Sequence, residues 1–334
     1  MIETPINSIK QQRVLLSPLN WGLGHVTRTI PIIQTLLKNE NEVIVCCDNQ
    51  QENIYRTYFP ELWYVPHGGY PFDFKGKGMW ALDILRQFFI LNSFLHEELK
   101  RVEDLVAKFD VDLVLSDQRF GFRSDKIRSI VISHQLNLPV SKWNVFAKYW
   151  NIRLLNKFDE IWVPDATDSI LSGAMSKLKL KKKRYIGSCS RFQNDAIEKL
   201  LPHDIKYKYL GLASGPSPYL EKFISLLVEK FKLIQGTCAI ISPIKCENLF
   251  FDLPENISFI YAPSHEDFLE VLLKSKTVIS RSGYSTLMDL LETGNKAILI
   301  PTKGQKEQEY LSKIHSNNAK WKFVDEDSFE AMQL

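Results

Sequence analysis

Two glycines and a histidine stand where an apolar segment gives way to a helical pattern near the start of the chain. The stretch RVLLSPLNWGLGHVTRTIPII, residues 13–33, contains Gly22, Gly24 and His25. Its apolar start predicts a strand, and the later isoleucines at helical spacing predict a helix. Glycine lets a ligand approach the backbone closely, and a helix N-terminus offers unpaired N–H groups. The junction therefore predicts a ligand site, with His25 able to exchange a proton near neutral pH.

The carboxylate of Asp117 is the candidate partner of His25. Asp117 ends the run VDLVLSD, which predicts a buried strand. Because neighbouring parallel strands bring their carboxyl ends to one edge of a sheet, Asp117 could lie beside His25 and orient it as a general base. Two simpler interpretations stay open: His25 as a loop histidine bonded to backbone, and Asp117 as a helix cap or turn residue.

A second constellation lies in ISRSGYSTLMDLLETGNKAILIPTKGQKEQEYL, residues 279–311. A predicted strand leads Arg281, Ser282 and Gly283 into a loop. The following helix opens with Ser285 and Thr286, whose hydroxyl and N–H groups can hold phosphate oxygens.

One turn into that helix, Asp289 points back to the same place. A carboxylate beside phosphate needs its own partner, and paired sugar hydroxyls are the usual one. This pattern suits a nucleoside diphosphate. The alternative is an ordinary strand-to-helix turn capped by Ser285 or Thr286.

Short apolar runs alternate with helical stretches along the whole chain, which predicts an α/β fold with doubly wound parallel sheets. The expected strands are 13–16, 42–46, 113–116, 130–133 and 160–163, then 207–212, 237–241, 257–261, 277–280 and 296–300. A length of 334 residues favours two domains. We place them at 1–190 and 207–334, with a polar linker at 191–206 and a ligand cleft between the two sheets.

Composition limits the choice of partners and compartment. Lys and Arg number 42 against 39 Asp and Glu, so the net charge of +3 does not indicate nucleic-acid binding. Five cysteines without a CxxC pair predict neither a zinc site nor a disulfide framework, and so a reducing compartment. No export signal or membrane-spanning run is present, which predicts a cytoplasmic protein. The pair Asp110 and Asp112 precedes its strand and is interpreted as a surface turn rather than a metal site.

Several motifs together resemble the GT-B glycosyltransferases, specifically the family 28-like enzymes that include the bacterial GlcNAc transferase completing the peptidoglycan lipid precursor. The motifs are GLGH at 22–25, SRSGYSTLMDLLETG at 280–294 and PTKGQKEQEY at 301–310. Uncharacterised bacterial relatives are closer still, because they also carry HQL, FDEIWVPD, YIGSCSR and SGPSP, here at 134–136, 158–165, 185–191 and 214–218.

The resemblance implies a GT-B fold, with two Rossmann-like domains facing across a cleft. The carboxy-terminal domain would bind a nucleotide-sugar, most simply a UDP-sugar, and the amino-terminal domain the acceptor. Matching positions imply donor-binding roles for Arg191, Ser214, Gly215, Arg281, Ser282, Gly283, Ser285, Thr286, Asp289, Gln308 and Glu309. Gly22, Gly24 and His134 are the acceptor-site candidates, and His25 with Asp117 the catalytic ones.

Sugar transfer requires a base for the acceptor hydroxyl and stabilisation of the departing diphosphate. His25 could supply the first. The helix dipole, loop N–H groups and Arg191 could supply the second without a metal or cofactor. The resemblance favours inversion of the anomeric centre.

Three other functions stay open. Gly22-Leu23-Gly24 followed by Asp48 partly matches a dinucleotide fingerprint, although Thr27 takes the place of the third glycine, so an NAD-dependent dehydrogenase is one. A sugar-nucleotide epimerase on the same fold and a non-catalytic nucleotide-binding protein are the others.

Aromatic and basic residues mix in two stretches, 71–95 and 142–158, the second with Trp143, Phe146, Trp150 and Leu154 near helical spacing. Core packing would explain them. An interfacial helix on an anionic membrane would also explain them, and would suit a lipid-linked acceptor and a place on the inner face of the cell membrane. The basic run KLKLKKKR at 177–184 is either a solvated surface or a contact for anionic lipid or phosphorylated substrate.

Overall fold

The chain forms two compact units in the computed structural model, which describes residues 4–71, 88–139, 145–192, 197, 204–249 and 253–334. The first unit runs to Arg191 but leaves out the segment Trp21–Gly24. That segment groups with the second unit, Phe192–Leu334. Most of the expected linker, and Trp143, lie outside the described residues.

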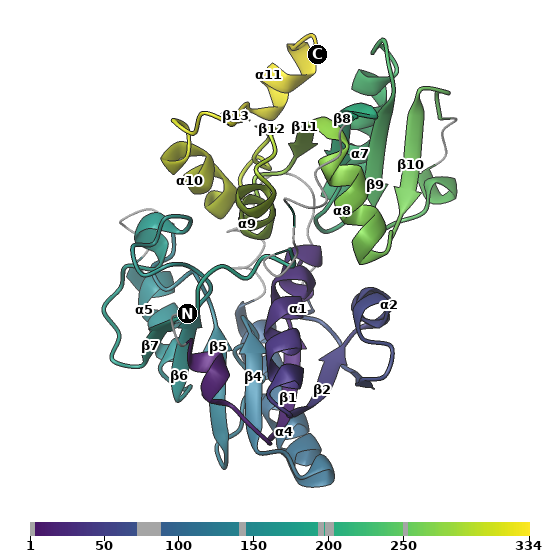
Figure 1. Ribbon diagram of the computed structural model, residues 1–334. Helices are drawn as coiled ribbons and strands as arrows, with labels where there is room; N and C mark the ends of the chain where they lie inside the picture. The colour runs from purple at the N-terminus through teal and green to yellow at the C-terminus, as the bar shows by residue number, and fades with distance from the viewer. Residues whose placement is uncertain (1–3, 72–87, 140–144, 193–196, 198–203, 250–252) are drawn as a thin grey trace. The chain divides into compact units, whose positions relative to one another are not determined.

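Seven parallel strands form the sheet of the first unit, in the order β3-β2-β1-β4-β5-β6-β7 (Figure 1). Their bounds are β1 Arg13–Pro18, β2 Glu42–Cys47, β3 Trp63–Pro66, β4 Leu113–Asp117, β5 Arg128–Ile132, β6 Glu160–Val163 and β7 Lys183–Tyr185. The strand order reverses between β1 and β4, and Pro18 pairs with Asp117 at their carboxyl ends. In open parallel sheets this reversal is the usual place for a ligand.

Helices pack their apolar sides on this sheet. The α-helices are α1 Leu23–Lys38, α2 Asn49–Tyr58, α4 Phe88–Phe109 and α5 Val145–Leu155, with 3-10 turns at η1 Pro5–Ser8 and η2 Gly173–Met175. Val102 and Val106 of α4 join Leu15 and Ile44 in one buried cluster. Burial on the sheet fixes the start of α1, and with it the position of His25.

A second parallel sheet, of six strands, forms the other unit in the order β10-β9-β8-β11-β12-β13. The strands are β8 Tyr207–Leu212, β9 Cys238–Ser242, β10 Ile257–Tyr261, β11 Ser275–Ser280, β12 Ala297–Leu299 and β13 Trp321–Phe323. The helices are α7 Tyr219–Phe231, α8 His265–Leu273, α9 Tyr284–Thr293, α10 Lys306–Ile314 and α11 Glu326–Ala331, with a 3-10 turn at η3 Cys246–Leu249. Phe223, Leu227 and Phe231 of α7 pack against Ile240 and Ile279 of the sheet.

The expected α/β class of two parallel-sheet domains is confirmed. Every strand expected from the sequence is present, whereas β3, β7 and β13 were missed. These three are edge strands of only three or four residues, too short to show the periodicity that marks the longer strands. No helix in the described part of the chain has the length and apolar character needed to cross a bilayer.

Candidate functional site

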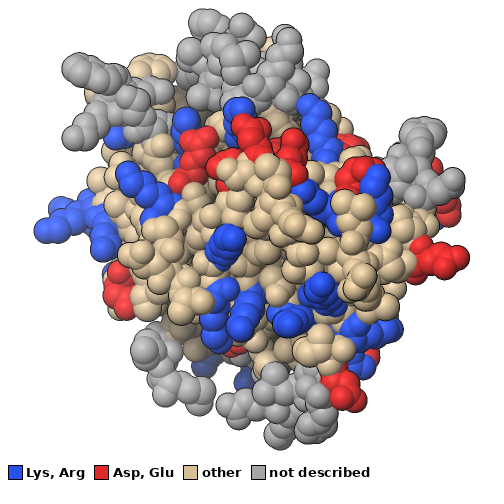
Figure 2. Space-filling model, turned by 90° about the horizontal axis from the view of Figure 1, so that it is seen from above, with Lys and Arg blue, Asp and Glu red and all other residues tan. Residues whose placement is uncertain are grey.

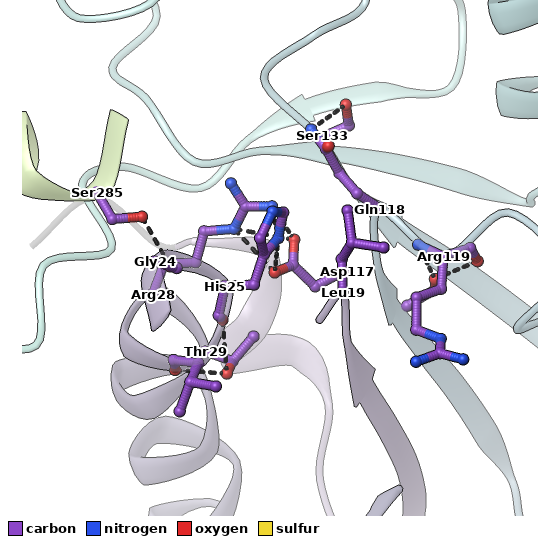
Figure 3. Close-up of polar contacts among 12 residues, drawn as sticks. Leu19, Gly24, His25, Arg28, Thr29, Asp117, Gln118, Arg119, Ser133 and Ser285 are labelled. Atoms are coloured by element: carbon purple, nitrogen blue, oxygen red, sulfur yellow. Dashed lines mark hydrogen bonds and ion pairs between the residues drawn. The ribbon is translucent and has the colours of Figure 1, made fainter. Parts of the chain in front are cut away.

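His25 and Asp117 meet at the carboxyl edge of the first sheet (Figure 3). His25 lies in the first turn of α1, and Asp117 is the last residue of β4. The Nδ1 atom of His25 is 2.9 Å from Oδ2 of Asp117. The Asp117 side chain is fully buried, while 15% of the His25 side chain is exposed. The juxtaposition expected from the strand-end argument is therefore present, and the catalytic roles stay predictions.

Arg28 completes this cluster and was missed from the sequence. Its Nε atom donates to both carboxylate oxygens of Asp117, at 2.9 Å each, and Nη2 also pairs with Oδ1. Nη2 lies 2.7 Å from Nδ1 of His25, and Nη1 lies 3.2 Å from Nδ1 of His134. Only 2% of the Arg28 side chain is exposed. Its position three residues after His25 on a helix puts both on one face, which was the available signal.

The Asp117 carboxylate is ionised in this setting. Burial by itself would raise its pKa, but the charge of Arg28 and the contacts with His25 outweigh that effect and hold the pKa of Asp117 below 3.8. An ionised carboxylate only accepts hydrogen bonds. Asp117 can therefore take a proton-bearing Nδ1 of His25 as a donor, which leaves the lone pair of that ring on Nε2.

The backbone around Asp117 is also held. Its carbonyl oxygen accepts from the N–H of Leu19 at 3.0 Å, across the β1–β4 edge. Gln118 follows with a φ of +57°, and its Nε2 donates to Ser133 Oγ at 3.3 Å, next to His134. These bonds fix the loops that carry Asp117 and His134 relative to each other.

A second buried charge cluster lies in the same unit and was also missed. Glu98 of α4 accepts from Nε of Arg119 at 2.7 Å and contacts Nε2 of His67 at 3.1 Å. Arg119 Nη2 donates to the carbonyl of Gly68 at 2.6 Å. Burial lowers the pKa of His67 below 6.5, more than the hydrogen bond with Glu98 raises it. The cluster ties the loops after β3 and β4 to α4.

The expected phosphate loop joins β11 to α9 in the second unit. Gly283 precedes the first residue of α9, and Ser285 and Thr286 lie in its first turn. Ser282 is fully buried, and its Oγ donates to the carbonyl of Gln308 at 3.3 Å. Arg281 is buried over the ring of Phe223.

Arg281 also pairs with a carboxylate of the same unit. Its Nη1 atom lies 3.1 Å from Oε2 of Glu326. Burial lowers the pKa of Arg281, against the effect of Glu326. In the described structure the Arg281 charge therefore faces a carboxylate, so a role in donor binding stays a prediction.

The remaining donor candidates lie on the neighbouring loops. Asp289 is 6% exposed within α9. Oε1 of Gln308 accepts from the N–H of Thr302 at 2.8 Å, and Oε1 of Glu309 from the N–H of Gly304 at 2.8 Å. The last two side chains thus brace the loop before α10. Ser214 and Gly215 follow β8, Gly215 with a φ of +123°, and Arg191 ends the first unit.

Gly22 and Gly24 lie in the segment between β1 and the body of α1, and Gly22 has a φ of +108° that favours glycine. Asp48, the acid of the alternative dinucleotide fingerprint, is the N-cap of α2. It accepts from the N–H of Gln51 at 2.9 Å. Asp112 accepts from the N–H of Arg13 at 2.8 Å, at the amino end of β4. Both carboxylates have structural explanations.

A segment of the second unit matches a known family. Residues 231–328 match the Glycosyltransferase family 28 C-terminal domain. This range includes the β11–α9 loop and α10, and it supports the expected class of enzyme, a glycosyltransferase. A search of curated proteins finds no match to the chain.

Solved structures share the fold. The spinosyn rhamnosyltransferase SpnG complexed with thymidine diphosphate is 13% identical with a TM-score of 0.63, covering 96% of this chain and 88% of that one. MurG from Acinetobacter baumannii is 12% identical with a TM-score of 0.50, covering 96% and 86%. UDP-GlcNAc 2-epimerase from Neisseria meningitidis, bound to UDP-GlcNAc, is 14% identical with a TM-score of 0.54, covering 96% and 94%. At these identities the likeness establishes the GT-B fold.

Proposed function

We propose that the protein transfers a hexose or N-acetylhexosamine from a UDP-sugar to an acceptor hydroxyl, with inversion of the anomeric centre. The observation that carries the proposal is the match of residues 231–328 to the family 28 domain. The His25–Asp117 contact supports it, because transfer needs a positioned base. The specific relation to the peptidoglycan GlcNAc transferase family is part of the proposal, based on the shared motifs.

In the proposed reaction, His25 accepts the proton of the acceptor hydroxyl as its oxygen attacks the anomeric carbon. The bond from that carbon to the diphosphate breaks, and the nucleoside diphosphate leaves with the electron pair. A single displacement of this kind inverts the centre. Asp117 orients the ring of His25, and His134 and the Gly22–Gly24 segment contribute to acceptor binding.

The second unit would hold the donor. N–H groups at the start of α9, with the hydroxyls of Ser285 and Thr286, would bind the diphosphate and stabilise the charge that develops on it. Asp289 would bind the ribose hydroxyls. Arg191 would add positive charge near the diphosphate, and Gln308 and Glu309 would contact the sugar.

Ligand-induced stabilisation tests donor binding directly. A ligand that binds only the native state raises the melting temperature, by an amount set by its concentration relative to Kd. We expect UDP-sugars to raise it more than GDP- or dTDP-sugars, and Asp289→Asn to abolish the effect. Asp327→Asn, an exposed acid on α11, is the matched control. Absence of stabilisation by every sugar nucleotide would count against the proposal.

An epimerase is the second candidate, because the fold is shared with UDP-GlcNAc 2-epimerase. Product analysis separates the two activities. An epimerase converts the sugar of UDP-GlcNAc without any acceptor, whereas a transferase releases UDP and requires an acceptor for rapid turnover.

We also propose that the first unit docks on an anionic bilayer, where a lipid-linked acceptor would be reached. On α5, Val145, Phe146 and Tyr149 are 66%, 61% and 64% exposed. The basic run contacts the chain just after this helix, where Lys182 Nζ donates to the carbonyl of Phe158 at 2.7 Å.

Within the basic run, apolar and charged side chains separate. Leu178 and Leu180 pack on the cluster that contains Phe158, while Lys177, Lys179 and Lys181 are exposed. Exposed apolar side chains and exposed lysines within one unit are the components of an interfacial docking surface. Figure 2 shows a face of the molecule on which basic and acidic side chains are both present, so this face does not carry a single sign of charge.

A further inference from the structure

One buried guanidinium contacts three side chains of the candidate site. Arg28 lies 2.9 Å from Asp117 through Nε, 2.7 Å from His25 through Nη2 and 3.2 Å from His134 through Nη1 (Figure 3 shows the first two partners). A surface arginine would rarely hold three such partners at once. Because Arg28 is 2% exposed, these contacts are also poorly screened by water.

The contact with His134 specifies a tautomer. Arginine carries five N–H donors and no acceptor. The Nδ1 atom of His134 must therefore present a lone pair to Nη1 of Arg28, which places the ring proton on Nε2. A doubly protonated ring would set two N–H groups against each other in a buried place.

At His25, Arg28 affects whether the imidazole ring is protonated and positively charged. The contact with the carboxylate of Asp117 favours an imidazolium ring, as in any histidine–aspartate pair. Arg28 already binds both oxygens of that carboxylate. Where Nδ1 of His25 donates its proton to Asp117, it cannot also accept from Nη2 of Arg28, so their 2.7 Å approach brings two N–H groups together and disfavours a positive charge on the ring. The two effects oppose each other, so His25 can stay uncharged next to Asp117, as a general base must.

We propose that Arg28 is a positioning residue of the reaction: its guanidinium keeps His25 uncharged and holds His134 in the tautomer with its proton on Nε2. This inference rests on the proposed function. It adds that the two histidines serve different purposes, His25 as proton acceptor and His134 as hydrogen-bond donor.

The other groups of the first unit near this cluster do not titrate in the working range. Burial raises the pKa of Cys189 to about 12, and it raises that of Tyr55, whose hydroxyl contacts Thr29 of α1, well above 10. Among the described groups of this unit, Asp117 and Arg28 are charged groups that contact the His25 ring directly.

Nitrogen-15 spectra of the histidine rings, recorded without substrate, test the inference in the wild-type protein. His25→Asn and His134→Asn assign the two signals. We expect an unprotonated Nδ1 on His134 at pH 7. A protonated Nδ1 on that ring would overturn the inference whether or not the protein transfers sugar, so the two failures are distinguishable.

Arg28→Gln removes the charge and should extend the charged form of His25 to higher pH. An uncompensated carboxylate at contact distance shifts such a titration by about 1 to 3 pH units, so the acidic limb of the kcat/KM profile should move up by about that much. Arg28→Lys keeps the charge without the planar fork. The acidic limb of the kcat/KM profile of Arg28→Lys should stay near that of the wild type. The fixed tautomer of His134 should be lost in this variant.

Arg119→Gln is the matched control, because it removes another buried arginine–carboxylate pair of the same unit, with Glu98. Arg119→Gln should lower stability. It should move neither the acidic limb of the kcat/KM profile nor the titration of the His25 ring. Identical ring titrations of His25 in folded Arg28→Gln and wild-type protein would refute the inference.

Discussion

Two buried carboxylates of the first unit are each paired with a buried arginine, and this governs which residues can be replaced. Asp117 is matched by Arg28, and Glu98 by Arg119. Removing one partner of such a pair leaves an uncompensated buried charge, at a cost of about 3 to 5 kcal/mol. His25 differs, because its substitution leaves the Asp117–Arg28 pair intact. It is therefore the residue at which chemistry can be separated from folding.

His25→Ala should reduce sugar transfer by about 10² to 10⁴-fold, the usual contribution of a general base. Binding of the donor nucleotide should be nearly unchanged, because the proposed donor residues other than Arg191 belong to the second unit. Initial rates of UDP release with acceptor present, together with nucleotide titration, measure both. His96→Ala, an exposed histidine of α4, is the control. Transfer at the wild-type rate in His25→Ala would remove His25 from the mechanism.

His67 predicts a pH dependence of stability. Its pKa in the folded protein lies below the ordinary 6.5, so near that pH the unfolded chain binds more protons than the native one. The free energy of unfolding should therefore fall as the pH drops below about 6.5, with the loss complete once the pH has passed the folded pKa.

His67→Gln should flatten this part of the stability curve, and urea unfolding at a series of pH values measures it. The lowered pKa of Asp117 reduces stability as the pH falls through and below about 3.8, so the slope just below pH 6.5 is the part of the curve that reports on His67. His96→Gln should keep the wild-type slope. If the free energy of unfolding of His67→Gln changed with pH as steeply as that of the wild type, His67 would not be the source of the pH dependence.

At the scale of elements, α9 connects the proposed phosphate loop to the core of the second unit. It begins after Gly283, in extended conformation, and ends at Gly294, which has a φ of +69°. Its inner residues Leu287 and Leu290 are buried. The end of the helix can therefore be perturbed without touching the loop that would bind the donor.

Gly294→Ala should destabilise the protein by about 1 to 2 kcal/mol, the cost of a side chain in the left-handed region. An added Cβ would also come within 3.2 Å of Lys320 Nζ, a flexible group that can move. Thermal or urea unfolding measures the change. Gly68→Ala, where an added Cβ meets nothing within 4 Å, should be close to neutral. Equal losses of stability in Gly294→Ala and Gly68→Ala would show that the left-handed conformation of Gly294 is not the cause of the cost.

At the scale of the whole molecule, each unit has its own parallel sheet and its own apolar core. The excess of positive charge is concentrated in the run 177–184, because the rest of the chain has a net charge of −3. Attraction to an anionic surface would therefore act on the first unit and not on the molecule as a whole.

Wild-type protein should sediment with vesicles that contain phosphatidylglycerol, and less as salt is raised, because salt screens exposed charges. Replacing Phe146 and Tyr149 together by serine should weaken binding by roughly tenfold or more, from the lost apolar burial. Leu233→Ser, at a residue of the second unit that is 77% exposed, is the control. Equal sedimentation with uncharged phosphatidylcholine vesicles, or no effect of the double substitution, would discard the docking surface.

Local patterns in the sequence were enough for the architecture. Runs such as Val14–Leu16 and Val43–Cys46 are apolar because both faces of a parallel sheet are covered, so the central strands are readable one by one. The rule that parallel strands share a carboxyl edge then predicted the meeting of His25 and Asp117. That prediction needed only strand positions, which are local information.

Tertiary structure decided the rest of the site. Arg28 and Asp117 are 89 residues apart and Arg28 and His134 are 106 apart. Helical spacing could place Arg28 near His25, but it could not show that Arg28 also reaches Asp117 and His134. Likewise, only the folded chain shows that Glu98, in a helix that reads as amphipathic, faces Arg119 in the interior. The sequence by itself determined ten of the thirteen strands and the edge where the chemistry would lie, because periodicity is a property of neighbouring residues. The partners of each charge depend on packing between distant segments, which neighbouring residues do not specify.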